Sequence, residues 1–140
     1  MYMPTFRSRI GRKLTGSSVF ALAVVAMPGT AQAACVQTGL VIECTGNTTG
    51  PVTSSQDGVT LQVADGAQVD GQTAGEAILL SGIDTTIVND GTVQTAADNR
   101  AALRAANGNG SVTISNNGTV IATGIGFTSG IQAGGLTDVM

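Results

Sequence analysis

Short segments in which hydrophobic and polar residues alternate recur along the chain, and several end at a glycine preceded by Asn or Asp. Residues 87–93 (IVNDGTV) return as residues 114–120 (ISNNGTV), with five of seven positions identical at an offset of 27. A fainter echo, residues 63–66 (VADG), lies 25 positions before residues 88–91 (VNDG). Alternating β-branched residues closed by a turn signal are typical of a strand, a turn and a second strand.

A second motif lies between the copies of the first. Its three related pieces are residues 76–82 (EAILLSG), 100–105 (RAALRA) and 129–134 (SGIQAG). Each motif therefore returns after roughly 24 to 29 residues. Two motifs that alternate with the same period indicate one structural unit that is repeated.

Two arrangements of this unit agree with the pattern. One is a local hairpin, because Asn-Gly and Asp-Gly favour type I′ turns. The other is a parallel β-helix, in which each repeat makes one coil and equivalent residues of successive coils lie about 4.8 Å apart. Only the second gives a reason for the same residues to return after 27 positions. The sequence therefore predicts an all-β fold, a right-handed parallel β-helix of about four coils after a cleaved signal peptide. The predicted stacking ladder places Asn89 over Asn116, Gly91 over Gly118 and Val93 over Val120.

Residues 97–107 (ADNRAALRAAN) carry a conflicting signal. Their helix propensity is high, with Asp98 as a possible N-cap and Gly108 as a stop. Their match to residues 76–82 favours a strand instead. We predict a strand, because stacking on neighbouring coils overrides a weak local preference.

The N-terminus has the pattern of an export signal. Arg7, Arg9, Arg12 and Lys13 precede an apolar run at residues 19–27 (VFALAVVAM), and Ala31-Gln32-Ala33 follows it. A positive start, a short apolar centre and an A-x-A end are typical of a cleaved secretory signal peptide. As a membrane anchor the run is too short, since nine helical residues span about 14 Å of a hydrocarbon core of roughly 30 Å. We predict cleavage between Ala33 and Ala34.

Two cysteines, Cys35 and Cys44, follow directly after the predicted cut. In an oxidising compartment an even pair so close in sequence is expected to form a disulfide, with a stabilisation of roughly 2.5–3 kcal/mol. Half a zinc site is the weaker alternative, because no partner Cys or His is present. The predicted organisation is a signal peptide at residues 1–33, an N-terminal cap with the disulfide at 34–56, and the β-helical repeats at 57–140.

Charge excludes several kinds of partner. The chain after residue 33 has two arginines, nine carboxylates, no lysine and no histidine, a formal charge of −7, and its only aromatic residue is Phe127. Such a surface repels nucleic acid and anionic membranes, which both bind through clustered Lys and Arg.

The same inventory predicts no catalytic residue, no metal site and no cofactor. Without histidine or lysine, neither a Ser-His-Asp triad nor a Ser-Lys dyad can form, and the G-G-x-G-x-D repeat of calcium β-rolls is missing. The remaining alternative is a polysaccharide-acting β-helix enzyme, a hydrolase or lyase with paired carboxylates. The acidic residues that could meet across coils are Asp65, Asp70, Asp84, Asp90 and Asp98. Several of them precede glycine, however, where Asp usually serves turns, and aromatic platforms for sugars are missing.

The signal peptide, the cysteine pair in ACVQTGLVIEC and the N-x-G-T-V units at residues 89–93 and 116–120 together resemble the passenger region of a Gram-negative autotransporter. The resemblance covers about residues 1–135. It implies a β-helical passenger that a C-terminal outer-membrane barrel carries to the cell surface, as a structural or adhesive stalk in contact with host cells, neighbouring cells or glycans.

The expected route of this chain follows from that resemblance. The signal peptide would engage the secretion machinery, and the protein would pass through the periplasm to the cell surface or the medium if a barrel follows. A single aromatic residue after the cut cannot form the aromatic girdles of such a barrel. We therefore expect either a fragment of a longer protein that contains the barrel or a truncated gene.

Overall fold

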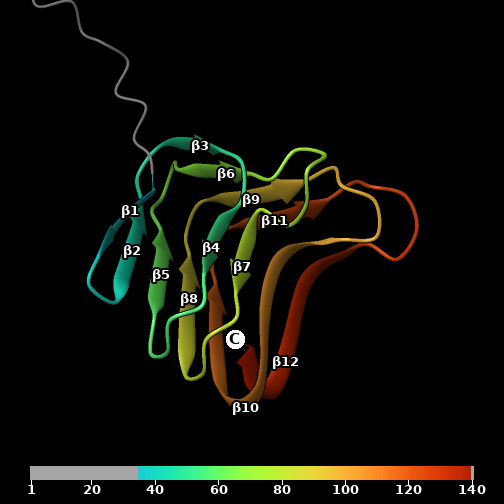
Figure 1. Ribbon diagram of the computed structural model, residues 1–140. Coiled ribbons are helices and arrows are strands. Elements are labelled where there is room, and N and C mark those ends of the chain that lie inside the picture. Colours follow the sequence, from blue (N-terminus) through green and yellow to red (C-terminus); the bar gives the residue numbers. More distant parts are fainter. Residues whose placement is uncertain (1–34, 140) are drawn as a thin grey trace, which may run out of the picture.

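A computed structural model describes residues 35–139, which contain twelve strands and no helix (Figure 1). The predicted cleavage position between Ala33 and Ala34 lies outside the described residues. In chain order the strands are β1 (Cys35–Thr38), β2 (Val41–Cys44), β3 (Asn47–Thr49), β4 (Val52–Ser54), β5 (Thr60–Val63), β6 (Gln68–Asp70), β7 (Ile78–Leu80), β8 (Thr85–Asn89), β9 (Thr92–Thr95), β10 (Ala101–Asn116), β11 (Thr119–Ala122) and β12 (Ser129–Val139).

The strands stack in parallel as a β-solenoid, which confirms the predicted β-helix. β3, β6, β9 and β11 form a four-stranded sheet in which each strand pairs in parallel with the equivalent strand of the next turn. The second sheet has eight strands and covers the other two faces, because β10 is long enough to run along both of them. Between β3 and β11 the chain completes about three turns, slightly fewer than the four or so predicted for the chain after the signal peptide.

The predicted strand over residues 97–107 is confirmed for its larger part. Residues 101–106 form the first half of β10, which pairs with β7 on one side and β12 on the other. Residues 97–100 form a turn before it, in which Asn99 has a φ of 55°. Strand pairing on both sides and full burial of Leu103 outweigh the helix propensity of this segment.

Alternation along each strand fills a narrow aliphatic interior. Every second side chain of a strand points inward, and parallel register places equivalent side chains of successive turns above one another. The inward columns are Ile42, Leu61, Ile87 and Ile114 on one face, Val69, Val93 and Val120 on the second, and Val52, Ile78, Leu103 and Ile131 on the third. Each fully buried aliphatic side chain contributes about 1.5–3 kcal/mol relative to an exposed one.

The fainter echo at residues 63–66 does not coincide with the strand register. An offset of 25 would place Val63 beside Val88, but Val63 pairs with Asn89. The reason is the corner after β5, which extends over residues 64–67, whereas the next corner contains only residues 90–91. A shift of one residue would turn the Val63 side chain outward, so the strand register follows the buried face.

At the N-terminal end, β1 and β2 form an antiparallel hairpin in which Cys35 and Cys44 are directly opposite. The two cysteines form a disulfide, as predicted. Cys44 is fully buried at the top of the column that continues through Val63 and Asn89. Residues 34–56 were expected to act as a cap. β2, β3 and β4 within this range already pair in parallel with β5, β6 and β7, so the range contains both the hairpin and the first turn of the solenoid.

Candidate binding groove

Three loops stack at one corner of the solenoid, where the chain leaves the four-stranded sheet. They are residues 71–77 after β6, residues 96–100 after β9 and residues 123–128 after β11, and the later two extend away from the body in Figure 1. Backbone hydrogen bonds join successive loops, from Ala96 N to Gln72 O at 2.7 Å and from Asn99 N to Ile125 O at 3.1 Å.

A groove of about 430 Å³ lies beside these loops, at the end of the four-stranded sheet. Six of its eight lining residues have a polar group, and the lining consists of Asp70, Gln72, Thr73, Gln94, Thr95, Ala96, Ile121 and Thr123. Three of these residues are register partners on the outward face, because Asp70 lies beside Gln94 and Gln94 beside Ile121. The groove therefore follows the stacking direction of the solenoid.

Asp70 organises the polar part of the groove. Its Oδ2 accepts a hydrogen bond from Gln94 Nε2 at 2.8 Å, and its Oδ1 accepts one from the Gln72 backbone N–H at 2.7 Å. Gln72 has a φ of 52°, a left-handed conformation that non-glycine residues adopt only rarely. The carboxylate thus holds in place both the Gln94 amide of the next turn and Gln72, the second residue of the loop.

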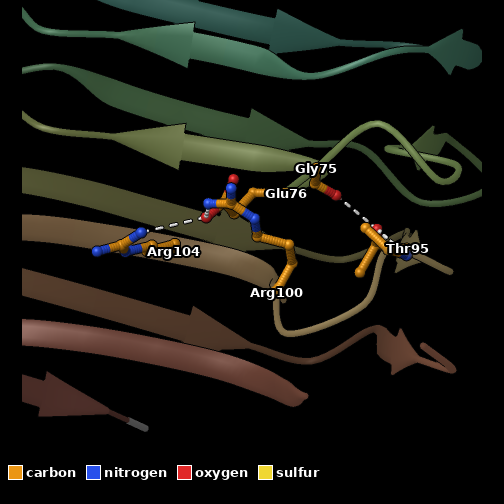
Figure 2. Close-up of polar contacts among 6 residues, drawn as sticks. Gly75, Glu76, Thr95, Arg100 and Arg104 are labelled. Atoms are coloured by element: carbon orange, nitrogen blue, oxygen red, sulfur yellow. Dashed lines mark hydrogen bonds and ion pairs between the residues drawn. The ribbon is translucent and has the colours of Figure 1, made fainter. Parts of the chain in front are cut away.

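The Thr95 side chain connects backbone groups of two turns at the same corner. Its buried hydroxyl oxygen lies 2.6 Å from Gly75 O and 3.0 Å from Gln72 O, and it accepts a hydrogen bond from Ala97 N at 3.2 Å. Figure 2 shows the contact with Gly75. Because these partners belong to two successive turns, the hydroxyl joins the loop at residues 71–77 to the turn above it.

Glu76 and two arginines form an ion-pair cluster next to this corner (Figure 2). Glu76 is only 7% exposed, and its Oε1 lies 3.3 Å from Arg100 Nη1 and 3.2 Å from Arg104 Nη1. Burial raises the pKa of Glu76, but hydrogen bonds from the backbone and from Arg104, together with Arg100, lower it below its ordinary value overall. Both arginines of residues 35–139 are therefore engaged with one buried carboxylate.

The aspartates that could form a catalytic pair are distributed over several corners. Their hydrogen bonds run to the neighbouring turn: from Ser111 N to Asp84 Oδ1 at 3.0 Å, from Asn117 Nδ2 to Asp90 Oδ1 at 3.0 Å and from Ile125 N to Asp98 Oδ1 at 2.6 Å. The two hydrogen bonds from Ser111 lower the pKa of Asp84. Asp65 lies in the corner between β5 and β6, away from the groove that contains Asp70. Within residues 35–139, no group of three or more His, Cys, Asp or Glu side chains is arranged to hold a metal ion.

These inter-turn contacts were missed at the level of sequence, where the aspartates followed by glycine were interpreted as local turn residues. The signal was present in their spacing. Asp57 and Asp84 are 27 positions apart, and each accepts from a backbone N–H of the following turn, Ile83 N and Ser111 N respectively. The spacing of 27 residues between these two aspartates equals the spacing of the N-x-G-T-V units, so both indicate the same stacking of turns.

The predicted stacking ladder lies at a different corner, before the four-stranded sheet. Asn89, which is 0% exposed, is the register partner of Asn116 and donates from Nδ2 to Asn116 Oδ1 at 2.7 Å. Val93 and Val120 are also register partners. Gly91 and Gly118 lie so close together that a Cβ on Gly118 would collide with Gly91 O. Neither glycine has a left-handed φ, so close approach rather than turn geometry selects glycine here.

The loop at residues 123–128 displays two apolar side chains. Ile125 is 80% and Phe127 is 95% exposed. Asp98 and Asn99 of the loop below accept hydrogen bonds from the backbone N–H groups of Ile125 and Phe127, at 2.6 and 3.0 Å. The backbone of this loop is thereby held by side chains of the preceding turn.

Over residues 35–139, the fold contains no helix of the length and hydrophobicity needed to cross a membrane. Comparison of the chain with protein-family models, with curated proteins and with solved structures gave no match.

Proposed function

We propose that this chain is the passenger of an exported, autotransporter-like protein and works outside the cytoplasm as a structural or adhesive stalk. The observation that carries the proposal is a repetitive solenoid whose N-terminal hairpin is crosslinked by the Cys35–Cys44 disulfide. Disulfides form and persist in oxidising compartments. The export pattern at residues 1–33 and the resemblance of the N-x-G-T-V units point in the same direction.

The architecture suits a stalk for a mechanical reason. Each turn contacts only its neighbours and adds about 4.8 Å of length, so rigidity comes from parallel pairing along the whole stack. Outward positions carry Thr, Gln, Asn and Asp, which can contact other surfaces through hydrogen bonds. Binding is favoured over catalysis, because the hydrogen bonds of Asp70, Asp84, Asp90 and Asp98 hold neighbouring turns and loops together.

Localisation tests this proposal. The full chain with a C-terminal epitope tag would be produced in a Gram-negative host and followed by fractionation, thiol alkylation and N-terminal mass spectrometry. We expect a mature chain that begins at Ala34, contains no alkylatable thiol before reduction and is found outside the cytoplasm. A matched variant, Ala33→Arg, should accumulate uncleaved, because signal peptidase requires a small residue there. An uncleaved cytoplasmic wild type with two reactive thiols would contradict the proposal.

A further inference from the structure

We propose that the groove beside β6, β9 and β11 binds a segment of a neutral oligosaccharide. This inference rests on the proposed function, for which it names a site and a class of ligand. The groove volume of about 430 Å³ falls within the range of roughly 300–1,000 Å³ that is usual for small-molecule sites.

β6 and β9 are paired on both sides, whereas β11 is the last strand of this sheet. A ligand on the outward face of the three strands therefore meets mainly side chains. β6, β9 and β11 hydrogen bond to one another, and Gln72 O accepts from Ala96 N. An extended peptide is usually bound by adding a strand to a free sheet edge. The groove lies instead on the outward face of the sheet, where side-chain amides, hydroxyls and a carboxylate line it.

These side chains match the hydrogen bonding of sugar hydroxyl groups, which both donate and accept. Gln94 gives one N–H to Asp70 and retains a second N–H and its Oε1. Asp70 accepts from two protein groups, and its two oxygens have further lone pairs. Asp70 and Gln94 belong to successive turns, whose strands lie about 4.8 Å apart. Their carboxylate and amide are joined by a hydrogen bond of 2.8 Å, so together they offer a ligand one continuous polar surface.

The groove also has an apolar position. Ile121 follows Gln94 in the same outward column and is partly exposed. A sugar ring presents C–H groups on its faces and hydroxyls at its rim, so an aliphatic side chain beside a row of polar ones fits both parts of a pyranose. The order Asp70, Gln94, Ile121 therefore places polar and apolar contacts along one line.

The charge of the groove disfavours anionic sugars, which leaves neutral sugars as the ligand proposed here. Asp70 is the only charged residue in the groove lining. Arg100 and Arg104 are both engaged with Glu76, and residues 35–139 contain no lysine or histidine. A carboxylated or sulfated glycan would meet a negative charge with no nearby cation to offset it.

The test uses the full chain purified after export, and titrates it by calorimetry with neutral hexasaccharides of glucose and of N-acetylglucosamine and with hexagalacturonate. We expect at least one neutral hexasaccharide to bind and hexagalacturonate not to bind. Gln94→Ala should weaken the neutral complex about tenfold, since hydrogen bonds to a bound ligand are lost. Gln62→Ala is the matched control, an exposed outward glutamine of β5 in the other sheet, and should leave binding unchanged.

A second variant separates charge from shape. Asp70→Asn keeps an acceptor for Gln72 N, and its Nδ2 can donate to Gln94 Oε1 once the Gln94 amide turns over. Because the variant has no negative charge, it should retain the neutral hexasaccharide and gain measurable binding of hexagalacturonate. Thermal melting would show that each variant is folded. The inference is overturned if neither neutral hexasaccharide binds, if hexagalacturonate binds wild type as tightly, or if Gln94→Ala and Gln62→Ala behave alike. Failure here in a chain located outside the cytoplasm would leave the stalk proposal intact.

Discussion

Substitution of Gly91 tests whether close stacking, rather than turn geometry, selects the glycine of the N-x-G-T-V unit. Gly91 lies inside the stack, between the turns that contain Ala67 and Gly118. A Cβ at this position would collide with Ala67 O and lie 3.0 Å from Val63 Cγ1. Ala67 O accepts a hydrogen bond from Thr92 N at 2.9 Å, so movement of this carbonyl disturbs the bond between two turns.

The expected loss of stability follows from these contacts. Overpacking a well-packed site costs about 1–3 kcal/mol. Weakening the Thr92–Ala67 hydrogen bond adds about 1 kcal/mol. Gly91→Ala should therefore lower the free energy of unfolding by roughly 2–4 kcal/mol. In a domain of about 100 residues, each kcal/mol shifts Tm by roughly 4–8 °C, and we expect a decrease of at least about 8 °C.

Two other glycines provide matched controls in the same thermal and guanidinium unfolding assays. Gly75 has no left-handed φ and no atom within 4 Å of an added Cβ, so Gly75→Ala should be neutral or slightly stabilising. Gly66 has a φ of +74° and equally open surroundings. There Asn, which tolerates this conformation, should replace glycine at little cost.

The decisive comparison is therefore Gly91→Asn with Gly66→Asn. If turn geometry selected Gly91, asparagine would be tolerated at both positions. If stacking selects it, Gly91→Asn should be at least as damaging as Gly91→Ala. Equal stability of the two asparagine variants, or of Gly91→Ala and Gly75→Ala, would refute the reasoning.

Three further predictions concern other parts of the stack. Replacing Cys35 and Cys44 together by serine should lower the free energy of unfolding by about 2.5–3 kcal/mol in guanidinium titrations, and reductant should bring wild type to the same value. The pKa of Glu76 is lowered in the folded protein, so its carboxylate stabilises the fold fully at pH values above the ordinary pKa of 4.5. This stabilisation is lost as the pH falls through the lower pKa of the folded state. Denaturant titrations between about pH 7 and pH 3 should show a steeper loss for wild type than for Glu76→Gln. Asn89→Val leaves the acceptor of Asn116 without its donor and should cost about 1–3 kcal/mol. Adding Asn116→Val should restore most of that loss, whereas additive effects in this double-mutant cycle would contradict the ladder.

The repeat predicted the register of the later turns well, because equal corners separate their strands. Ile87, Asn89 and Val93 reach Ile114, Asn116 and Val120 at the offset read from the sequence, since the corners at residues 90–91 and 117–118 have the same length. The corner at residues 64–67 is longer. The sequence echo at Val63 therefore differs from the strand register by one residue, because Val63 pairs with Asn89 rather than Val88. Burial of the side chain decides the register, and sequence similarity does not.

The groove could not be predicted in the same way. Asp70, Gln94 and Ile121 differ in chemistry, so no repeated letter marks their column. The loops beside it also differ in length and sequence, and their relative position depends on hydrogen bonds such as Ala96 N to Gln72 O. Comparison of the repeats in the sequence identifies residues that are the same in successive turns. A binding site formed from the differences between turns becomes visible only when the strands are stacked.

The acidic character of the chain has a structural explanation in the corners. At or near the corners, aspartate side chains accept hydrogen bonds from backbone N–H groups of the next turn. Asp57, Asp84 and Asp98 do so from Ile83, Ser111 and Ile125 respectively. Such acceptors recur from turn to turn, whereas both arginines of residues 35–139 lie at the buried carboxylate of Glu76. A solenoid stabilised in this way accumulates negative charge with each added turn, and the same charge favours neutral partners over anionic ones at its surface.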